Sequence, residues 1–433
     1  MSTLTRGGKS SPASTAGPGF TQEIRGFFTR CELDKRKEHD DSCVIATSVK
    51  PTTQSKWTIG GDMNKLAAVA LASVLATGAG AACAQSSVTL YGRIDAGVEY
   101  MSGVPTGQNP VTGAATGSSS RFRAESGDWG TSLWGIKGVE DIGGGTKAVF
   151  HLEGAFNTMT GQGPSNNGLF DRYATVGIAN DRFGTVLLGK ELFLSNGVWD
   201  FDPFGQSNWS SASLVRGRNW NHTSNNISYQ SPTIAGFDIS GQYALSNATN
   251  WNGNGTTGQG RADAIQLTYT QPVFQIRAIY DEWRDAANGT LDDAFNFSRE
   301  YFGGVNVFLG KFKLQAVYQQ SHSSSGALSG GITLTQQEWG GVTWQATPAA
   351  ALIAAVYHVN ANNGGGNATI YTVGGTYNLT KRTLLDFQIA TARNSTHANF
   401  GLNANSFGDT TSTDNPLPGH SQSGAYAGIQ HLF

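Results

Sequence analysis

From about residue 86 onward, the chain alternates apolar and polar residues along segments that turn residues separate. In the first segment Val88, Leu90 and Val98 fall on one face, and Arg93 and Asp95 fall on the other. A period of two residues is typical of a β-strand with one apolar and one polar face. The pattern therefore predicts an all-β protein.

Four later segments repeat this pattern. Their apolar positions are Phe237, Ile239, Tyr243, Leu245, Ile265, Leu267, Tyr269, Phe274, Ile276, Tyr280, Phe312, Leu314 and Tyr318. Their polar positions are Asp238, Ser240, Gln242, Gln266, Thr268, Gln275, Arg277, Asp281, Lys311, Lys313 and Gln315. A soluble sandwich hides its apolar face inside on shorter strands, whereas a transmembrane barrel needs strands of about 10 residues, apolar outside and polar inside. Only a closed sheet or a helix satisfies every backbone group in lipid.

Counting such segments predicts roughly sixteen strands. They are expected near residues 86–101, 130–143, 144–156, 170–180, 181–190, 223–231, 234–246, 262–271, 272–284, 297–309, 310–322, 332–346, 347–361, 367–379, 380–394 and 421–433. Short and long connections alternate, and the first three long ones are 102–129, 157–169 and 191–222. This asymmetry is typical of outer-membrane barrels, with tight periplasmic turns and longer external loops. We expect a sixteen-stranded antiparallel transmembrane β-barrel.

The third long connection is unusually rich in aromatic residues. Residues 191–221 have neither a helical nor a strand period, yet they contain Phe193, Trp199, Phe201, Phe204, Trp209 and Trp220. A structureless loop of this length in a compact domain is usually functional or disordered, and disorder goes with few aromatic residues. We expect this third external loop to fold into the lumen and narrow it. The alternative is a surface loop with an aromatic anchor.

The N-terminal region has the pattern of an export signal. In residues 63–84, Lys65 precedes an apolar stretch that ends at the small-residue site Ala82-Cys83-Ala84. This predicts a secretory signal peptide cleaved after Ala84, with lipoprotein acylation of Cys83 as the alternative. Residues 1–62 are then expected to be a mis-assigned N-terminal extension, or else a long leader, and residues 85–433 the barrel.

Composition narrows the possible functions. The three cysteines precede residue 85, so the mature chain has no disulfide scaffold, thiol nucleophile or thiolate metal site. Ten of the 29 Lys and Arg and seven of the 31 Asp and Glu also precede residue 85, which leaves a net charge of −5. An exported and mildly acidic chain gives no indication of nucleic-acid binding. No cofactor or metal is expected.

Six motifs in order resemble the general porins of β-proteobacteria, across essentially the whole mature chain. They are SSVTLYGRIDAGVEY, WGIKGVEDIGGGTKAVFHLEGAF, FDRYATVGIANDRFGTVLLGK, NNISYQSPTIAGF, YNLTKRT and the C-terminal AYAGIQHLF. The resemblance implies a homotrimer of outer-membrane barrels, each a water-filled pore for small hydrophilic solutes and ions. It implies an inward third loop as the constriction. Phe433, with Ile429 and His431 at alternate positions, resembles the signal that the β-barrel assembly machinery reads.

The charged residues of this pore are assigned partly by alternation and partly by that resemblance. The expected basic wall is Arg93, Lys137, Arg172, Lys190, Arg216 and Arg218, and the residues expected on the loop across from it are Asp200, Asp202 and Glu191. Leu133 and Lys190 replace arginines that are common in the family, which thins the basic cluster. Arg121 and Arg123 could substitute if the loop before them curls inward. For each assigned charge the alternative is a solvated position away from the constriction, and for Arg172 a rim or subunit-contact role.

Two other functions are weighed against the pore. The carboxylates Asp200 and Asp202 with His222 could belong to a hydrolase, but no Ser-His constellation stands out at strand ends. A substrate-specific channel would have aromatic residues stacked along its lumen, whereas these cluster near strand ends and in residues 191–221. The sequence therefore favours an unspecific diffusion pore without catalysis.

Overall fold

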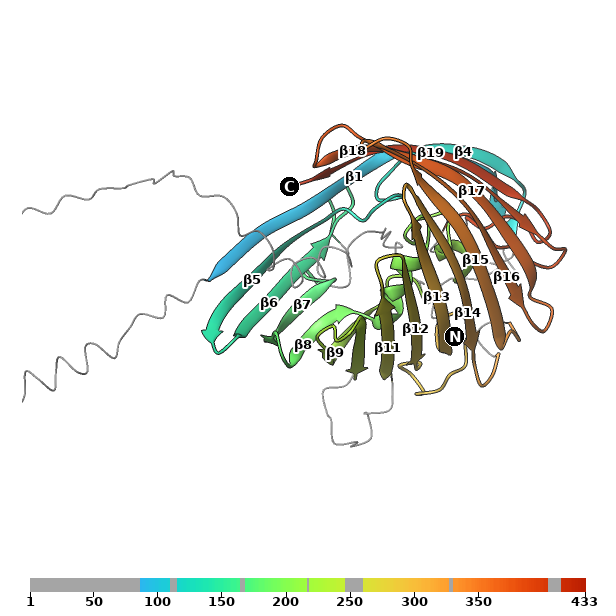
Figure 1. Ribbon diagram of the computed structural model, residues 1–433. Coiled ribbons are helices and arrows are strands. Elements are labelled where there is room, and N and C mark those ends of the chain that lie inside the picture. Colours follow the sequence, from blue (N-terminus) through green and yellow to red (C-terminus); the bar gives the residue numbers. More distant parts are fainter. Residues whose placement is uncertain are drawn as a thin grey trace, which may run out of the picture.

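The computed structural model describes residues 86–109, 115–163, 168–215, 218–245, 260–326, 330–403 and 414–433. Within these residues the chain forms a closed antiparallel barrel (Figure 1), which confirms the predicted fold. The predicted extension 1–62 and signal peptide 63–84 lie outside the described residues. No helix in the described ranges is long and apolar enough to span a membrane.

Seventeen strands form the wall. They are β1 (Ser87–Val104), β4 (Ser119–Glu125), β5 (Leu133–Gly143), β6 (Thr146–Ala155), β7 (Tyr173–Asn180), β8 (Gly184–Leu192), β9 (His222–Gln230), β10 (Phe237–Ala244), β11 (Ala262–Thr270), β12 (Phe274–Trp283), β13 (Arg299–Leu309), β14 (Phe312–His322), β15 (Leu334–Gln345), β16 (Ala350–Ala361), β17 (Gly366–Asn378), β18 (Thr383–Asn394) and β19 (Gln422–Leu432). Both β4 and β5 pair with β1, one after the other along its length. They therefore share one crossing, and the barrel has sixteen. The ring closes where β1 pairs with β19.

The first long connection differs from the prediction. Residues 102–129 were expected to be a loop, but they contain β4 and a small hairpin of β2 (Gly107–Gln108) and β3 (Ala115–Thr116). The reason is that β1 extends to Val104, which leaves backbone groups beyond residue 96 for β4 to bond. The irregular part of this connection is therefore shorter than predicted.

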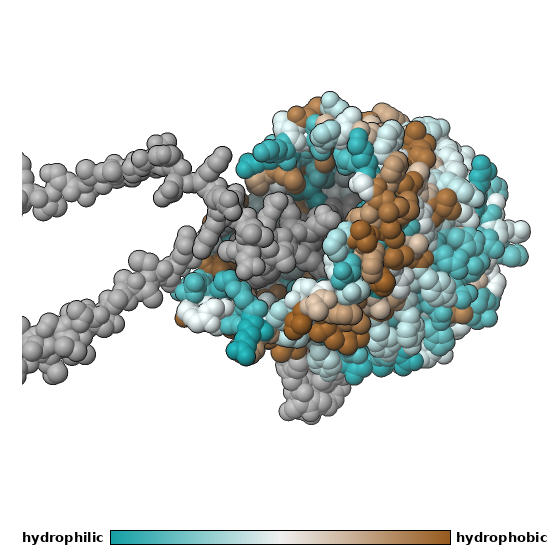
Figure 2. All heavy atoms as spheres, viewed as in Figure 1, coloured by the Kyte–Doolittle hydropathy of each residue, from teal (hydrophilic) through white to brown (hydrophobic). Residues whose placement is uncertain are grey.

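The two faces of the strands match the alternation in the sequence. Outward Val88 and Leu90 are exposed, and inward Arg93 and Asp95 are buried. Figure 2 shows hydrophobic residues gathered in a band on the visible face, with hydrophilic residues towards its edges. One prediction was wrong: Leu245 is 0% exposed, because β10 ends at Ala244 and the alternation stops there.

Aromatic residues ring the end of the barrel with the short turns. Phe237 stacks on Tyr269 with ring centroids 4.2 Å apart, and Phe312 stacks on Trp344. All four lie on the outward face, at most three residues from a short turn. Aromatic girdles mark the boundary between the lipid core and water in such barrels. This pattern places the short turns just beyond one boundary of the lipid core, and short turns in outer-membrane barrels are the periplasmic ones.

The C-terminal residue completes the seam between the first and last strands. The backbone N–H of Phe433 donates to the carbonyl of Gly92, and the N–H of Gly92 donates back, both at 3.1 Å. Ile429 and Phe433 are exposed on the outward face, and His431 Nδ1 lies 2.9 Å from Thr383 Oγ1. Of the residues predicted as the assembly signal, Ile429 and His431 thus lie on the last strand and Phe433 directly follows it, next to the closing seam.

Gly92→Val is expected to weaken this seam. A Cβ at Gly92 would overlap the ring of Phe433 and press on the carbonyl of Leu133. Overpacking of this kind typically costs about 1–3 kcal/mol of unfolding free energy, measurable by urea titration of the folded band on unheated gels. Gly303→Val is the matched control, because a Cβ there meets nothing within 4 Å. An equal loss of unfolding free energy in both variants would contradict the role given to the contact between Gly92 and Phe433.

Candidate functional site

The connection between β8 and β9 lies inside the barrel (Figure 1). It contains a 3₁₀ helix, η1 (Leu194–Phe201), and one turn of α-helix, α3 (Ala212–Val215). The aromatic side chains singled out from the sequence are all buried, namely Phe193, Trp199, Phe201, Phe204, Trp209 and Trp220. We call residues 193–221 the internal loop. A surface location for this loop is excluded by its contacts with inward-facing side chains.

Aromatic contacts hold the internal loop against the inner wall. Phe201 packs edge-on against Phe302 of β13, and its carbonyl accepts a hydrogen bond from Trp339 Nε1 at 3.1 Å. Trp209 packs edge-on against Tyr426 of β19. The loop therefore crosses the lumen from the β12–β14 side to the β19 side, and it covers the wall between them.

Asp200 is held by three neighbouring strands. Its carboxylate pairs with Arg277 of β12 at 2.6 Å. Its backbone carbonyl accepts hydrogen bonds from Asn306, Lys313 and Gln315 of β13 and β14 at 3.0–3.1 Å. Arg277 also donates to the carbonyl of Gly197 in η1. Asp200 thus holds the internal loop against the wall, and Arg277 is its ion-pair partner there.

Asp202 lies beneath the loop and not on its pore side, which corrects the predicted position. It is 3% exposed and accepts hydrogen bonds from Tyr357 Oη at 2.8 Å and from the backbone N–H groups of Phe204 and Ser211. Burial raises the pKa of this carboxyl above its ordinary value. Its role in the structure is to close the turn between η1 and α3 and tie it to β16.

Arg218 was predicted to face the pore, but its side chain is buried as well. It pairs with Asp281 of β12 and with Glu300 of β13, the latter at 3.3 Å, and it donates to the carbonyl of Ser298 at 3.0 Å. The guanidinium is 1% exposed. It therefore fastens the far end of the internal loop to the wall. Arg216, predicted beside it, lies outside the described residues.

A second group of predicted charges lies on the opposite wall. Arg172 is buried and pairs with Glu153 at 2.6 Å. Tyr91 Oη donates to the same carboxylate at 2.7 Å. Arg93 is also buried, and its Nε donates to the carbonyl of Thr131. Lys190 donates to Ser224 at 3.3 Å, within a β-bulge.

Two predicted residues meet at a cavity in the lumen. This cavity of about 250 Å³ lies between η1 and the wall formed by β5 to β12, and its lining includes Lys137, Glu191 and Arg277. The ammonium of Lys137 sits 4.8 Å from the ring centroid of Tyr91. Glu191 accepts hydrogen bonds from Asn226 and Gln242. The cavity thus combines two cations with one carboxylate that is already hydrogen-bonded.

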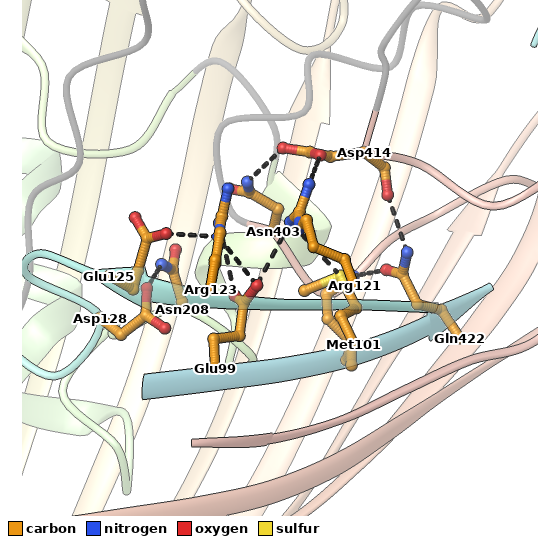
Figure 3. A network of polar contacts seen from close by, with 11 residues as sticks. Glu99, Met101, Arg121, Arg123, Glu125, Asp128, Asn208, Asn403, Asp414 and Gln422 are labelled. Atoms are coloured by element: carbon orange, nitrogen blue, oxygen red, sulfur yellow. Dashed lines mark hydrogen bonds and ion pairs between the residues drawn. The ribbon is translucent and has the colours of Figure 1, made fainter. Parts of the chain in front are cut away.

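A further polar network joins the internal loop to the seam and to an external loop (Figure 3). Glu99 of β1 pairs with Arg121 at 3.3 Å and with Arg123 at 3.0 Å, both on β4. Arg121 also pairs with Asp414 at 2.5 Å, in the connection before β19. Beside them, Asp128 accepts from Asn208 of the internal loop at 2.5 Å. Arg121 and Arg123 do point inward, but carboxylates engage both.

Sequence reasoning missed several of these residues as parts of the site. Arg277, Lys313, Asp281 and Glu300 fall on the inward faces of β12 to β14, and alternation indicates that face. One pattern in the sequence could have identified them. Each is a charged residue on the polar face of a strand, and the loop 191–221 carries charges that such residues can pair with. Among the described residues, no group of three or more His, Cys, Asp or Glu could hold a metal ion.

The chain is similar to known proteins over most of its length. Residues 67–397 match the family described as Gram-negative porin. An outer membrane porin protein of Bordetella pertussis is 30% identical over 262 residues, 58% of this chain and 68% of the relative. Outer membrane porin protein 32 of Delftia acidovorans is 29% identical over 85% of this chain and 100% of the relative. Among solved structures, an anion-selective porin from Comamonas acidovorans aligns with a TM-score of 0.64 and 25% identity, over 81% of this chain and 100% of that one.

Proposed function

This chain belongs to the Gram-negative porin family and is an outer-membrane channel for passive diffusion, and from that premise we propose that its internal loop makes the pore weakly selective for small hydrophilic anions. The observation that carries the proposal is the lumen cavity, whose lining holds Lys137 and whose one carboxylate, Glu191, already accepts hydrogen bonds from Asn226 and Gln242. The anion-selective porin from Comamonas acidovorans supports the sign of this preference.

The strength of the preference follows from simple electrostatics. Two unit charges about 8 Å apart in water interact by roughly 0.5 kcal/mol. Salt at physiological concentration screens over about the same distance. Each lumen charge therefore changes the rate of ion passage by about a factor of two. An effect of this size gives the pore a charge preference but does not create a tight solute-binding site.

Several cations predicted for the wall contribute less than expected. Arg93, Arg172 and Arg218 are buried and hydrogen-bonded. Arg277, which was not among the predicted cations, is paired with Asp200. A paired charge presents little net field to a passing ion. We assign the proposed selectivity chiefly to Lys137 because it is the lysine that lines the lumen cavity, with Lys190 and Lys313 as weaker contributors.

We further propose that the channel assembles as a trimer and matures by cleavage of a signal peptide. Solved barrels of this fold include a trimeric form, and the apolar outward faces of β1 and β19 are suited to contact between three identical subunits. Cleavage after Ala84 would leave residues 85–433 as the mature barrel, with residues 1–62 untranslated. The β-barrel assembly machinery would recognise Ile429, His431 and Phe433 on the last strand. No catalytic step and no cofactor belong to this proposal.

Lys137→Glu is expected to lower the anion-to-cation permeability ratio about fourfold, since one change removes a positive charge and adds a negative one. The reversal potential in a KCl gradient across a planar bilayer measures this ratio. Lys311→Glu is the control, because Lys311 is exposed at a periplasmic turn outside the cavity. Equal shifts in both variants would show that the cavity does not set the selectivity, while leaving the channel function intact.

A further inference from the structure

Three arginines and two carboxylates form a network at the external end of β11, β12 and β13. Glu282 pairs with Arg284 at 2.7 Å and with Arg299 at 2.6 Å. Asp263 pairs with Arg261 at 2.6 Å, and Arg261 also reaches Glu282 at 3.6 Å. One carboxylate thus gathers three guanidinium groups, and the cluster has one more positive charge than negative.

This network lies on the outward face of the barrel and not in the lumen. Asp263 is opposite Glu282, and Glu282 is opposite Arg299, so the three share one face of the sheet. Because side chains alternate, they share it with residues two positions away. Ile265 and Tyr301 occupy such positions and are 48% and 49% exposed. The charges therefore face the surrounding membrane.

Tyrosines fix the depth of the network in the membrane. Tyr280 and Tyr301 are neighbours, with ring centroids 5.2 Å apart, and Tyr280 Oη donates to Glu282 at 2.8 Å. Tyrosines of an outer-membrane barrel lie at the boundary between hydrocarbon and headgroups. Glu282 and Arg299 lie two residues beyond Tyr280 and Tyr301 towards the long loops, about 7 Å along each strand. This is the level of the outer-leaflet headgroups.

The arginines retain hydrogen-bonding capacity at this level. Arg299 is 37% exposed, and only its Nε has a partner among the described residues. Arg261 and Arg284 are 29% and 24% exposed, although Asp263 engages Nε and Nη2 of Arg261, and Glu282 and the carbonyl of Gly289 engage the terminal nitrogens of Arg284. A guanidinium fork matches the geometry of a phosphate and binds it in bidentate fashion. The two carboxylates hold the three guanidinium groups close together and leave one net positive charge.

We propose that Arg261, Arg284 and Arg299 bind the phosphate groups of a phosphorylated lipid in the outer leaflet. The site goes beyond the channel function, since it lies on the opposite side of the wall from the lumen. Charge complementarity carries the choice of ligand: the cluster is net positive and lies at headgroup depth beside an apolar wall that acyl chains can cover. A neutral headgroup would gain nothing from this excess charge.

The test counts lipids bound to the full-length mature oligomer extracted from outer membranes. Native mass spectrometry compares bisphosphorylated with dephosphorylated lipid A as the added probe. Wild-type protein is expected to retain the phosphorylated form preferentially. The double variant R284Q/R299Q is expected to bind it about 25-fold more weakly, at about fivefold for each basic residue lost near a charged membrane surface.

Two further variants make the outcome specific. Arg393→Gln removes an exposed outward arginine of β18 that lies outside the network, and it is expected to leave binding unchanged. Arg299→Lys keeps the charge but loses the fork, and it is expected to bind the phosphorylated lipid more weakly than wild type and more tightly than Arg299→Gln, which separates loss of charge from loss of fold. Equal binding of both lipids by wild type, or unchanged binding by R284Q/R299Q, overturns the site. Displacement of the lipid by inorganic phosphate would overturn its assignment to a membrane headgroup.

Discussion

Replacing residues 194–219 with a short Gly-Ser linker is expected to raise the single-channel conductance about two- to threefold, since an unobstructed sixteen-stranded barrel encloses a wide aqueous channel. The ends of the internal loop are already adjacent, because the N–H of Phe193 donates to the carbonyl of Asn221 at 2.9 Å. A short linker can therefore join β8 to β9 without disturbing their pairing. Planar-bilayer recordings give the conductance, and selectivity should weaken in the same variant.

The control for this replacement carries the same linker elsewhere. Inserting it after Gly310, in the periplasmic turn between β13 and β14, changes the chain length without touching the internal loop. Its conductance is expected to match wild type. If the loop replacement also conducts like wild type, the internal loop is not the constriction, whatever its contacts with the wall.

Arg218→Met is expected to lower the free energy of unfolding by roughly 3–5 kcal/mol, since removing one partner of a buried ion pair leaves uncompensated charge. Here Asp281 and Glu300 would both lose their cation in a site where the guanidinium is 1% exposed. Urea titration of the folded oligomer measures the loss. Bilayer recordings should show greater open-channel noise, because this pair holds the end of the internal loop.

Neutralising the whole cluster separates charge from packing. The triple variant R218M/D281N/E300Q removes the unpaired charges, and it is expected to recover most of the stability lost by Arg218→Met alone. A single variant that loses less than about 1 kcal/mol would place Arg218 among ordinary solvated charges. Loss in the triple variant as large as in the single variant would assign the effect to packing.

The architecture could be predicted from the sequence because its main determinants are local. A strand in lipid must show an apolar residue at every second position, and Val88, Leu90, Ile265 and Leu267 record that requirement directly. Alternating loop lengths then give the orientation of the barrel. The prediction failed where pairing between distant strands decided the outcome: β4 forms because β1 runs on to Val104, and nothing within residues 102–129 signals this alone.

The candidate site was predictable in outline but not in its contacts. The aromatic content of the loop indicated that it packs inside, whereas the partners of its charges lie far away in sequence. Asp202 bonds to Tyr357, and Arg218 to Asp281 and Glu300. Alternation shows that such residues share the lumen, but the path of an irregular loop decides which of them meet. For that reason charges assigned to the pore are found to hold the loop in place.

Single-channel conductance across a range of KCl concentrations tests the central claim most directly, on mature protein beginning at Gln85 in a planar bilayer. A water-filled channel for passive diffusion predicts discrete steps whose size rises about in proportion to KCl activity, with a small reversal potential in a salt gradient that indicates anion preference. Absence of steps, or a conductance that saturates at low salt, would contradict the account.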